Sequence, residues 1–158
     1  SEGLRKWDVG TIDLPDDSNP PSLVLGFTGN SSKTGKMVAM VADLISSNPE
    51  RKSDLDSIGD ITAMGLAALA SAEWETVGMA MNACQSRLEA LNLSTPFLEK
   101  LIASVRPHSL GAKLTGAGGG GCMMALTRDP TRVAQMMELH GAKAMISSFH
   151  NKGAQILG

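Results

Sequence analysis

The spacing of hydrophobic positions changes several times along the chain, and each change predicts a new element. Residues 23–28 are almost continuously apolar, which is typical of a strand covered on both faces. Small polar residues follow over 29–35, and apolar positions then return with helical spacing from Met37 to Ile45. Asn48 and Pro49 predict the end of this helix. The first part of the chain therefore reads as strand, loop and helix.

The middle of the chain is predicted to be helical throughout. A stretch rich in Ala, Met and Leu runs from Ser53 toward Trp74 and predicts a long second helix. A narrow stripe with steps of four and three predicts a third helix. Its positions are Val77, Met81, Cys84, Leu88 and Leu91. Thr95 as N-cap and Pro96 at the first helical position predict a fourth helix. Its expected buried positions are Phe97, Leu98, Leu101, Ile102 and Val105.

The last third of the chain changes character after Pro107. Two short strands are predicted at 111–115 and 122–126, and glycines separate them. Asp129 and Pro130 predict the start of another helix. Its apolar positions are Val133, Met136, Met137 and Leu139, and strands are expected around 144–149 and 153–157. This order predicts an α+β sandwich with helices on one face of a mainly antiparallel sheet. Residues 1–21, polar and proline-rich, form a connecting segment, and 22–158 form the domain.

Composition and charge narrow the function classes. With 158 residues, 42% of them hydrophobic, the chain is long enough for one domain with a real core, which methionine and alanine fill because aromatics are only 3%. The net charge of −2 argues against nucleic-acid and anionic-membrane partners. Cys84 and Cys122 lack metal or redox spacing and are expected to be buried, reduced thiols. Without a secretory signal or an apolar run of about 18 residues, a cytoplasmic protein is expected.

The glycine run is the strongest candidate for chemistry. Six of the 17 glycines lie between Gly111 and Gly121, and such a segment gives up much backbone entropy on folding. Two interpretations stay open. The run is either a flexible hairpin tip, or a loop whose backbone N–H groups and lack of Cβ atoms admit a phosphate.

A second candidate lies between Gly29 and Lys36, which nearly matches a Walker loop. Five residues separate its glycines and Met37 follows the lysine, so that interpretation fails. The segment is then either a helix start capped by Ser31, Ser32 or Thr34, or an anion-receptive helix N-terminus.

The ionisable residues predict neither a metal site nor a catalytic group. The histidines lie far apart and are expected on the surface, and three closely spaced aspartates near a helix start are expected to be solvated. These residues are His108, His140 and His150, and Asp54, Asp56 and Asp60.

A family resemblance follows from the glycine run. Residues 110–122, with Lys-Leu-Thr before the glycines and Cys after them, resemble the third motif of the GHMP kinases and are most similar to the mevalonate kinase branch. Residues 79–96 and 28–38 also look like segments of that branch, so the resemblance covers about 23–157. It implies a ferredoxin-like C-terminal domain, whereas the N-terminal domain with the ATP-phosphate loop and catalytic aspartate has no counterpart here.

The resemblance also implies a reaction and a set of site residues. The reaction would be transfer of the γ-phosphoryl group of Mg-ATP to the 5-hydroxyl of mevalonate, in isoprenoid biosynthesis. ATP and Mg2+ would be bound mainly by the missing N-terminal domain, so this chain alone should be inactive. The residues expected near the transferred phosphate are Gly116, Ala117, Gly118, Gly119 and Gly120. Thr34 would contact the substrate, Ser32 and Lys36 are weaker candidates for the same role, and Lys113 would support the loop.

Other functions remain open at this point. The segment 7–15 and the turn at Thr28 and Gly29 also look like phosphomevalonate kinase, and decarboxylase relatives that act on mevalonate diphosphate share the fold. A homodimer is open, as is a stand-alone, non-enzymatic α+β binding module. An enzyme part should expose small or apolar residues around 116–121 and 29–34, where its partner docks, whereas a finished module should be polar there.

Overall fold

The computed structural model describes residues 19–30 and 32–147. The strands are β1 (Ser22–Phe27), β2 (Gly111–Thr115), β3 (Cys122–Thr127) and β4 (Lys143–Ser147). The helices are α1 (Thr34–Ser47), α2 (Lys52–Ala70), α3 (Trp74–Ala90), α4 (Pro96–Val105) and α5 (Pro130–Leu139), with short 3-10 turns η1 (Pro49–Arg51) and η2 (Arg106–His108). The element types predicted from the hydrophobic pattern are confirmed, and the strand expected at 153–157 lies outside the described residues.

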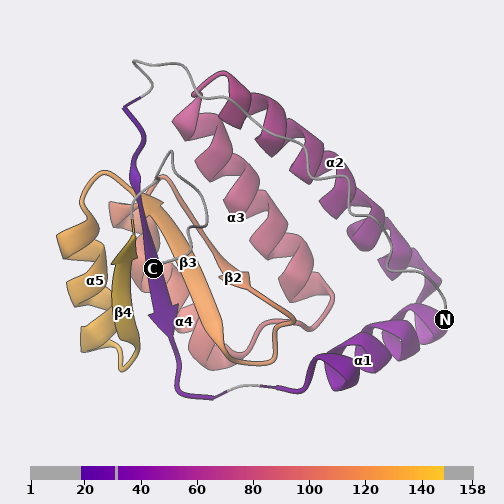
Figure 1. Cartoon of the computed structure of the whole chain (residues 1–158). Helices are drawn as coiled ribbons and strands as arrows, with labels where there is room; N and C mark the ends of the chain where they lie inside the picture. Colours follow the sequence, from indigo (N-terminus) through magenta and orange to yellow (C-terminus); the bar gives the residue numbers. More distant parts are fainter. Residues whose placement is uncertain (1–18, 31, 148–158) are drawn as a thin grey trace, which may run out of the picture.

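The strands form one four-stranded sheet in the order β2-β3-β1-β4. Every described strand pair is antiparallel, and Val24 of β1 lies opposite Ala125 of β3 and Ile146 of β4. The two central strands, β1 and β3, are each followed by a helix that leads to an edge strand, which is the ferredoxin-like arrangement. Helices α1 to α3 are additions inserted between β1 and α4 (Figure 1). The predicted fold class is confirmed.

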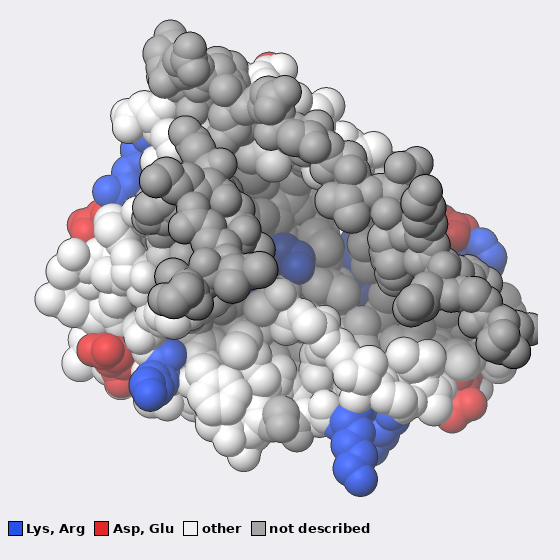
Figure 2. All heavy atoms as spheres, viewed as in Figure 1, with Lys and Arg blue, Asp and Glu red and all other residues white. Residues whose placement is uncertain are grey.

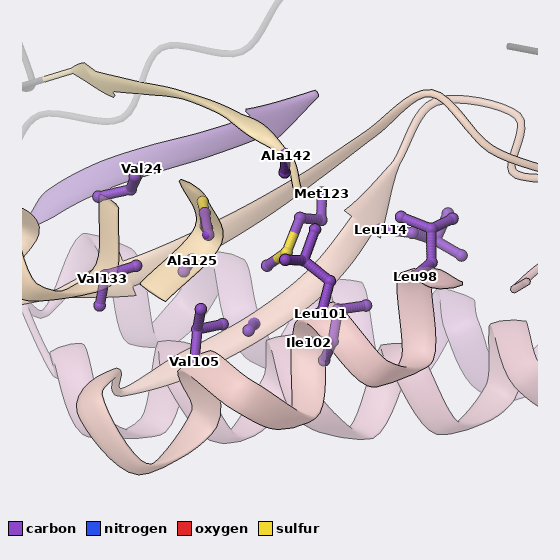
Figure 3. Packing of buried hydrophobic residues seen from close by; sticks show 12 residues of the cluster. Val24, Leu98, Leu101, Ile102, Val105, Leu114, Met123, Ala125, Val133 and Ala142 are labelled. Carbon is purple, nitrogen blue, oxygen red and sulfur yellow. The ribbon is translucent and has the colours of Figure 1, made fainter. Parts of the chain in front are cut away.

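The core lies between the sheet and a layer made of α4 and α5 (Figure 1, Figure 3). Leu101, Ile102 and Val105 of α4 point toward Met123 and Ala125 of β3. The buried members of the cluster are Val24, Leu98, Leu101, Ile102, Val105, Ala112, Leu114, Met123, Ala125, Val133, Met137 and Ala142. Aliphatic and methionine side chains thus fill the core, as the composition predicts.

One predicted core position, Phe97, is wrong, and Leu139, an apolar position of α5 for which no burial was predicted, is exposed as well. Phe97 is 41% exposed and Leu139 is 78% exposed. Both line a shallow pocket between the start of α4 and the end of α5, at the outer side of the helix layer. Helical spacing alone marked them as apolar positions, but they lie beyond the part of each helix that the sheet covers.

The two faces of the sheet differ in burial. Val24 and Gly26 face the helix layer, and a Cβ on Gly26 would lie 2.8 Å from the Met137 sulfur. On the opposite face Leu25 is half-buried and Phe27 is 43% exposed. The prediction that β1 is covered on both faces is therefore wrong for the described residues, since only alternate side chains are enclosed.

Helices α2 and α3 form a hairpin beside the sheet, with α3 along the outer edge of β2 (Figure 1). Asp54 ties this hairpin together, because its carboxylate accepts hydrogen bonds from Arg51 and Arg87, each at 3.0 Å. Asp54 is only 5% exposed, so its predicted solvation is wrong. Asp56, paired with Lys52 on the surface, is solvated as expected, as is Asp60. None of the described helices is both long and apolar enough for a transmembrane span.

Candidate functional site

Residues 116–121, here called the glycine loop, connect β2 to β3 and have an unusual backbone. Gly116, Gly118, Gly119, Gly120 and Gly121 all have positive φ, between 69° and 125°. L-residues pay about 1–2 kcal/mol to adopt the left-handed region, so a run of such angles favours glycine at each position. This is the physical reason for the glycine run.

Backbone hydrogen bonds hold the glycine loop from two sides. The Gly119 N–H donates to the Leu93 carbonyl, in the turn between α3 and α4, at 2.8 Å. The Gly121 N–H donates to the Asn30 carbonyl, and the Thr28 N–H donates to the Gly121 carbonyl at 2.9 Å. Two turns that are far apart in the sequence therefore hydrogen-bond the loop. The loop is not a free hairpin tip.

The start of α1 lies against the same loop. The Ser32 hydroxyl donates to the Gly119 carbonyl at 2.7 Å. Lys33 is the N-cap of α1 and makes no side-chain cap bond. Ser32 thus supports the loop instead of capping the helix, Thr34 is the first helical residue instead of its cap, and Ser31 lies outside the described residues.

The space available for a Cβ at each loop position shows where close packing requires glycine. A Cβ on Gly118 would overlap the Leu93 carbonyl oxygen, and a Cβ on Gly119 would lie 2.6 Å from both the Met37 sulfur and the Ser32 hydroxyl. Gly116, in contrast, has no atom within 4 Å of its Cβ position and is exposed. The loop is therefore packed at its centre and open at its β2 end.

The sequence-predicted site residues fall on one side of the molecule. Ser32 touches the loop directly, and Thr34 and Lys36 are exposed in the first turn of α1. Lys113 donates its Nζ proton to the neighbouring Leu114 carbonyl at 2.7 Å, just before the loop. The structure thus brings the loop and the α1 start together.

A groove of about 430 Å³ runs between α2 and α3 and reaches Lys113 and Gly116. Apolar side chains such as Ile61, Leu69 and Met81 line most of it. Figure 2 shows this face of the molecule hollowed, with a basic side chain visible inside the hollow and most other coloured side chains at the outer edge of the view.

The remaining candidates for chemistry are few. Within 19–30 and 32–147, no three His, Cys, Asp or Glu residues are grouped as a metal site. His108 and His140 are half-buried, and His150 lies outside the described residues. Cys84 and Cys122 are free thiols, as expected, but are half-buried and not buried. Groove and loop therefore offer backbone, hydroxyl and lysine groups.

Two polar residues near the site escaped the sequence analysis. Asn82 and Gln85 of α3 hydrogen-bond the backbone of β2 through their side-chain amides. Gln85 is completely buried. The sequence held one signal for them. Gly78, Asn82 and Gln85 are spaced by four and then three positions, which places all three residues on one helix face.

Comparison with known proteins identifies a matching family. Residues 66–143 match the sequence model of the family described as GHMP kinases C terminal. A mevalonate kinase of Pyrococcus furiosus is 35% identical over 142 residues, which cover 85% of this chain and 42% of that protein. One from Thermococcus onnurineus is 36% identical over 163 residues, which cover 98% of this chain and 48% of that protein. The chain thus spans less than half the length of these relatives.

Solved structures show the same fold. The crystal structure of L. major mevalonate kinase in complex with R-mevalonate aligns with a TM-score of 0.78. The alignment covers 87% of this chain and 44% of that protein at 23% identity. At that identity the likeness supports the fold alone.

Proposed function

Because this chain carries the C-terminal domain of the GHMP kinase family, we propose that it is the C-terminal part of an ATP-dependent kinase that phosphorylates the 5-hydroxyl of mevalonate. The archaeal relatives named mevalonate kinase support this substrate. Their greater length supports a second, N-terminal part that completes the site. A cytoplasmic location and a role in isoprenoid biosynthesis belong to the same proposal.

One observation carries the proposal: the glycine loop is fastened to the turn that starts α1. The Ser32 hydroxyl donates to the Gly119 carbonyl and the Asn30 carbonyl accepts from the Gly121 N–H, so the loop is held against the turn that leads into Thr34. Phosphoryl transfer depends mainly on the positioning of nucleotide and acceptor and on charge stabilisation. A loop beside the phosphates and a hydroxyl beside the acceptor, held to each other in this way, would meet the positioning requirement.

The loop residues divide their work in this proposal. Gly116 and Ala117 form the wall beside the phosphates of ATP, since a bare backbone lets a phosphate chain approach. Gly118, Gly119 and Gly120 give the loop its shape by packing against the protein itself. The loop and its neighbours offer backbone N–H, hydroxyl and lysine groups, which suit phosphate oxygens, and the family resemblance implies that the N-terminal part holds Mg2+. We assign Mg2+ to the N-terminal part.

The acceptor side of the site is the first turn of α1. The Thr34 hydroxyl contacts the alcohol, and the helix N-terminus together with Lys36 favours the carboxylate of the substrate. Ser32 is a weaker substrate contact because its hydroxyl proton is already donated to Gly119.

The exposed residues near the loop support a partner half. Phe27 is 43% exposed and Val38 is 64% exposed, and between them Gly29 and Gly35 are exposed as well. Polar side chains are exposed in the same stretch, at Asn30, Lys33, Thr34 and Lys36, so a docking domain would cover a mixed surface that contains these small and apolar positions.

Co-expression of two halves tests the function. The chain would be paired with the N-terminal half of the Pyrococcus furiosus mevalonate kinase, and the two halves of that enzyme would serve as the positive control. We expect ATP-dependent phosphorylation of mevalonate, and none from the chain alone. Turnover of phosphomevalonate only would move the substrate to the phosphomevalonate kinase alternative. No activity with any alcohol of the pathway, while the control pair is active, would contradict a kinase and favour the binding module.

A further inference from the structure

Strand β2 lies at the edge of the sheet, yet its outer edge is not left unpaired. Edge strands normally expose a row of free N–H and C=O groups. Here the side chains of α3 take the place of a fifth strand. The Ala112 N–H donates to the Asn82 Oδ1 at 3.1 Å, and the Leu114 N–H donates to the Gln85 Oε1 at 2.8 Å.

Asn82 imitates one residue of a parallel strand. Its Nδ2 also donates to the Leu110 carbonyl at 3.4 Å, so one amide bonds the C=O before Gly111 and the N–H after it. A residue on a parallel neighbour strand makes the same pair of bonds. The helix comes close enough because Gly78 and Gly111 meet, where a Cβ on either would overlap backbone of the other segment.

Gln85 links the outer edge of β2 to the turn that holds the centre of the glycine loop. Its Nε2 donates to the Glu89 Oε1 at 2.9 Å and to the Ser94 hydroxyl at 3.4 Å. Both contacts orient the amide so that its oxygen faces the Leu114 N–H. Ser94 follows Leu93, whose carbonyl holds the Gly119 N–H. One buried side chain therefore touches the strand that leads into the loop and the turn that grips the loop at its centre.

We propose that Gln85, assisted by Asn82, is a positioning residue that sets where the glycine loop lies relative to the phosphates of the nucleotide. The proposal rests on the proposed function for the identity of the ligand, but not for the hydrogen bonds. Gln85 acts from behind the loop, with no contact to substrate. A purely structural role, in which the amide only satisfies buried polar groups, predicts a loss of global stability and no selective effect at the loop.

Amide hydrogen exchange of the chain separates these two roles without any assay of activity. In Gln85→Met, a side chain of similar size that cannot accept a hydrogen bond, we expect the Leu114 and Gly119 amides to exchange at least about tenfold faster. The amides of Met123 and Val133 should change less than about twofold. Gln135→Met, on the exposed surface of α5, is the matched control and should leave all four unchanged. Faster exchange at Leu114 follows in either role because this amide loses its acceptor, so uniform acceleration, or no selective change at Gly119, would overturn the proposal.

A rescue variant guards against a simple failure to fold. In Gln85→Glu the new carboxylate still accepts from the Leu114 N–H but faces the Glu89 carboxylate, so like charges oppose each other. Adding Glu89→Gln places an amide N–H donor at position 89 opposite the new carboxylate acceptor at position 85. We expect the double variant to recover slow exchange at Leu114 and Gly119, and failure of this recovery with a folded protein would contradict the orienting role of Glu89.

The assembled kinase supplies the functional readout. Gln85→Met should raise KM for ATP about tenfold and leave KM for mevalonate within about twofold, since the loop faces the nucleotide and α1 faces the alcohol. Equal effects on both KM values, or an effect on kcat alone, would overturn the positioning role. Lack of activity in the unmodified assembly would instead refute the proposed function, and the exchange experiment would still judge the role of Gln85.

Discussion

Glycine can be needed in the loop for two separate reasons: a positive φ angle, or a lack of space for a Cβ. All five loop glycines have positive φ, but only some also lack room for a side chain. Gly118 faces the Leu93 carbonyl oxygen without space for a Cβ, whereas Gly116 has the same backbone conformation and open surroundings. Their difference isolates packing from backbone strain.

Gly118→Ala and Gly116→Ala should therefore differ in cost. Gly116→Ala pays the left-handed penalty of about 1 kcal/mol, and Gly118→Ala adds an overpacking cost of about 1–3 kcal/mol. Urea unfolding of each purified variant measures the free energy of unfolding. Equal losses would show that Leu93 does not confine the loop.

Asp54 gives a residue-scale prediction with a defined pH dependence. Hydrogen bonds from Arg87 and then Arg51 lower the pKa of its carboxyl group below the ordinary value. A folded-state pKa below the unfolded one stabilises the protein above the unfolded value of about 3.9. That contribution is lost as the pH falls through the lowered folded value.

Asp54→Asn should consequently lower the free energy of unfolding at neutral pH, and its difference from the unmodified chain should shrink below about pH 4. Asp56→Asn, at a surface carboxylate paired with Lys52, is the control and should have little effect. Thermal unfolding between acidic and neutral pH measures both. A deficit of Asp54→Asn that persists unchanged at low pH would contradict the ion-pair explanation.

At the scale of elements, the contact between α3 and β2 depends on two glycines. Gly78 and Gly111 let a helix backbone approach a strand backbone closely, and this approach allows the short Asn82 side chain to reach β2. A glycine inside a helix normally weakens it by about 1 kcal/mol relative to alanine. Its presence in α3 is therefore explained by the neighbouring strand.

Two helical glycines should respond to alanine with opposite signs. Gly59→Ala in α2, with nothing within 4 Å of the Cβ position, should stabilise the chain by about 0.5–1 kcal/mol through helix propensity. Gly78→Ala should destabilise it by about 2–4 kcal/mol because the Cβ would overlap Leu110. Chemical denaturation of both variants checks the signs, and a stabilised Gly78→Ala would disprove the close contact.

The same scale shows what could be predicted from the sequence. Thr95 and Asp129 accept hydrogen bonds from Leu98 and Arg132 at the helix starts where the sequence placed caps, because capping is a local interaction. The buried side of α3 could not be found in this way. The apolar stripe of α3 pointed to Met81 and Cys84 as positions on its packed side. Both are half-buried in the groove, whereas Gln85 is buried against β2. Burial of a polar amide depends on a strand far along the chain, which helical spacing does not encode.

At the scale of the whole molecule, the chain has the features of one wall of a cleft. The glycine loop and the start of α1 form a joint surface, and apolar groups such as Phe27 and Val38 remain exposed next to it. The position of the loop and its need for glycine could be predicted from the sequence, and its role beside the nucleotide stays a prediction from the family resemblance. Its attachment to two distant turns could not, because hydrogen bonds to Leu93 and Asn30 carbonyls involve backbone that any residue type provides.

The most direct test of the central claim is amide exchange of the glycine loop in the assembled halves, with and without MgATP. We expect nucleotide to slow exchange at Gly116 and Ala117 by about tenfold or more, with no change in the amides of α5, because the phosphates cover the open end of the loop. If the assembly binds nucleotide while exchange at Gly116 and Ala117 stays unchanged, the loop does not line the phosphate site and the account is contradicted.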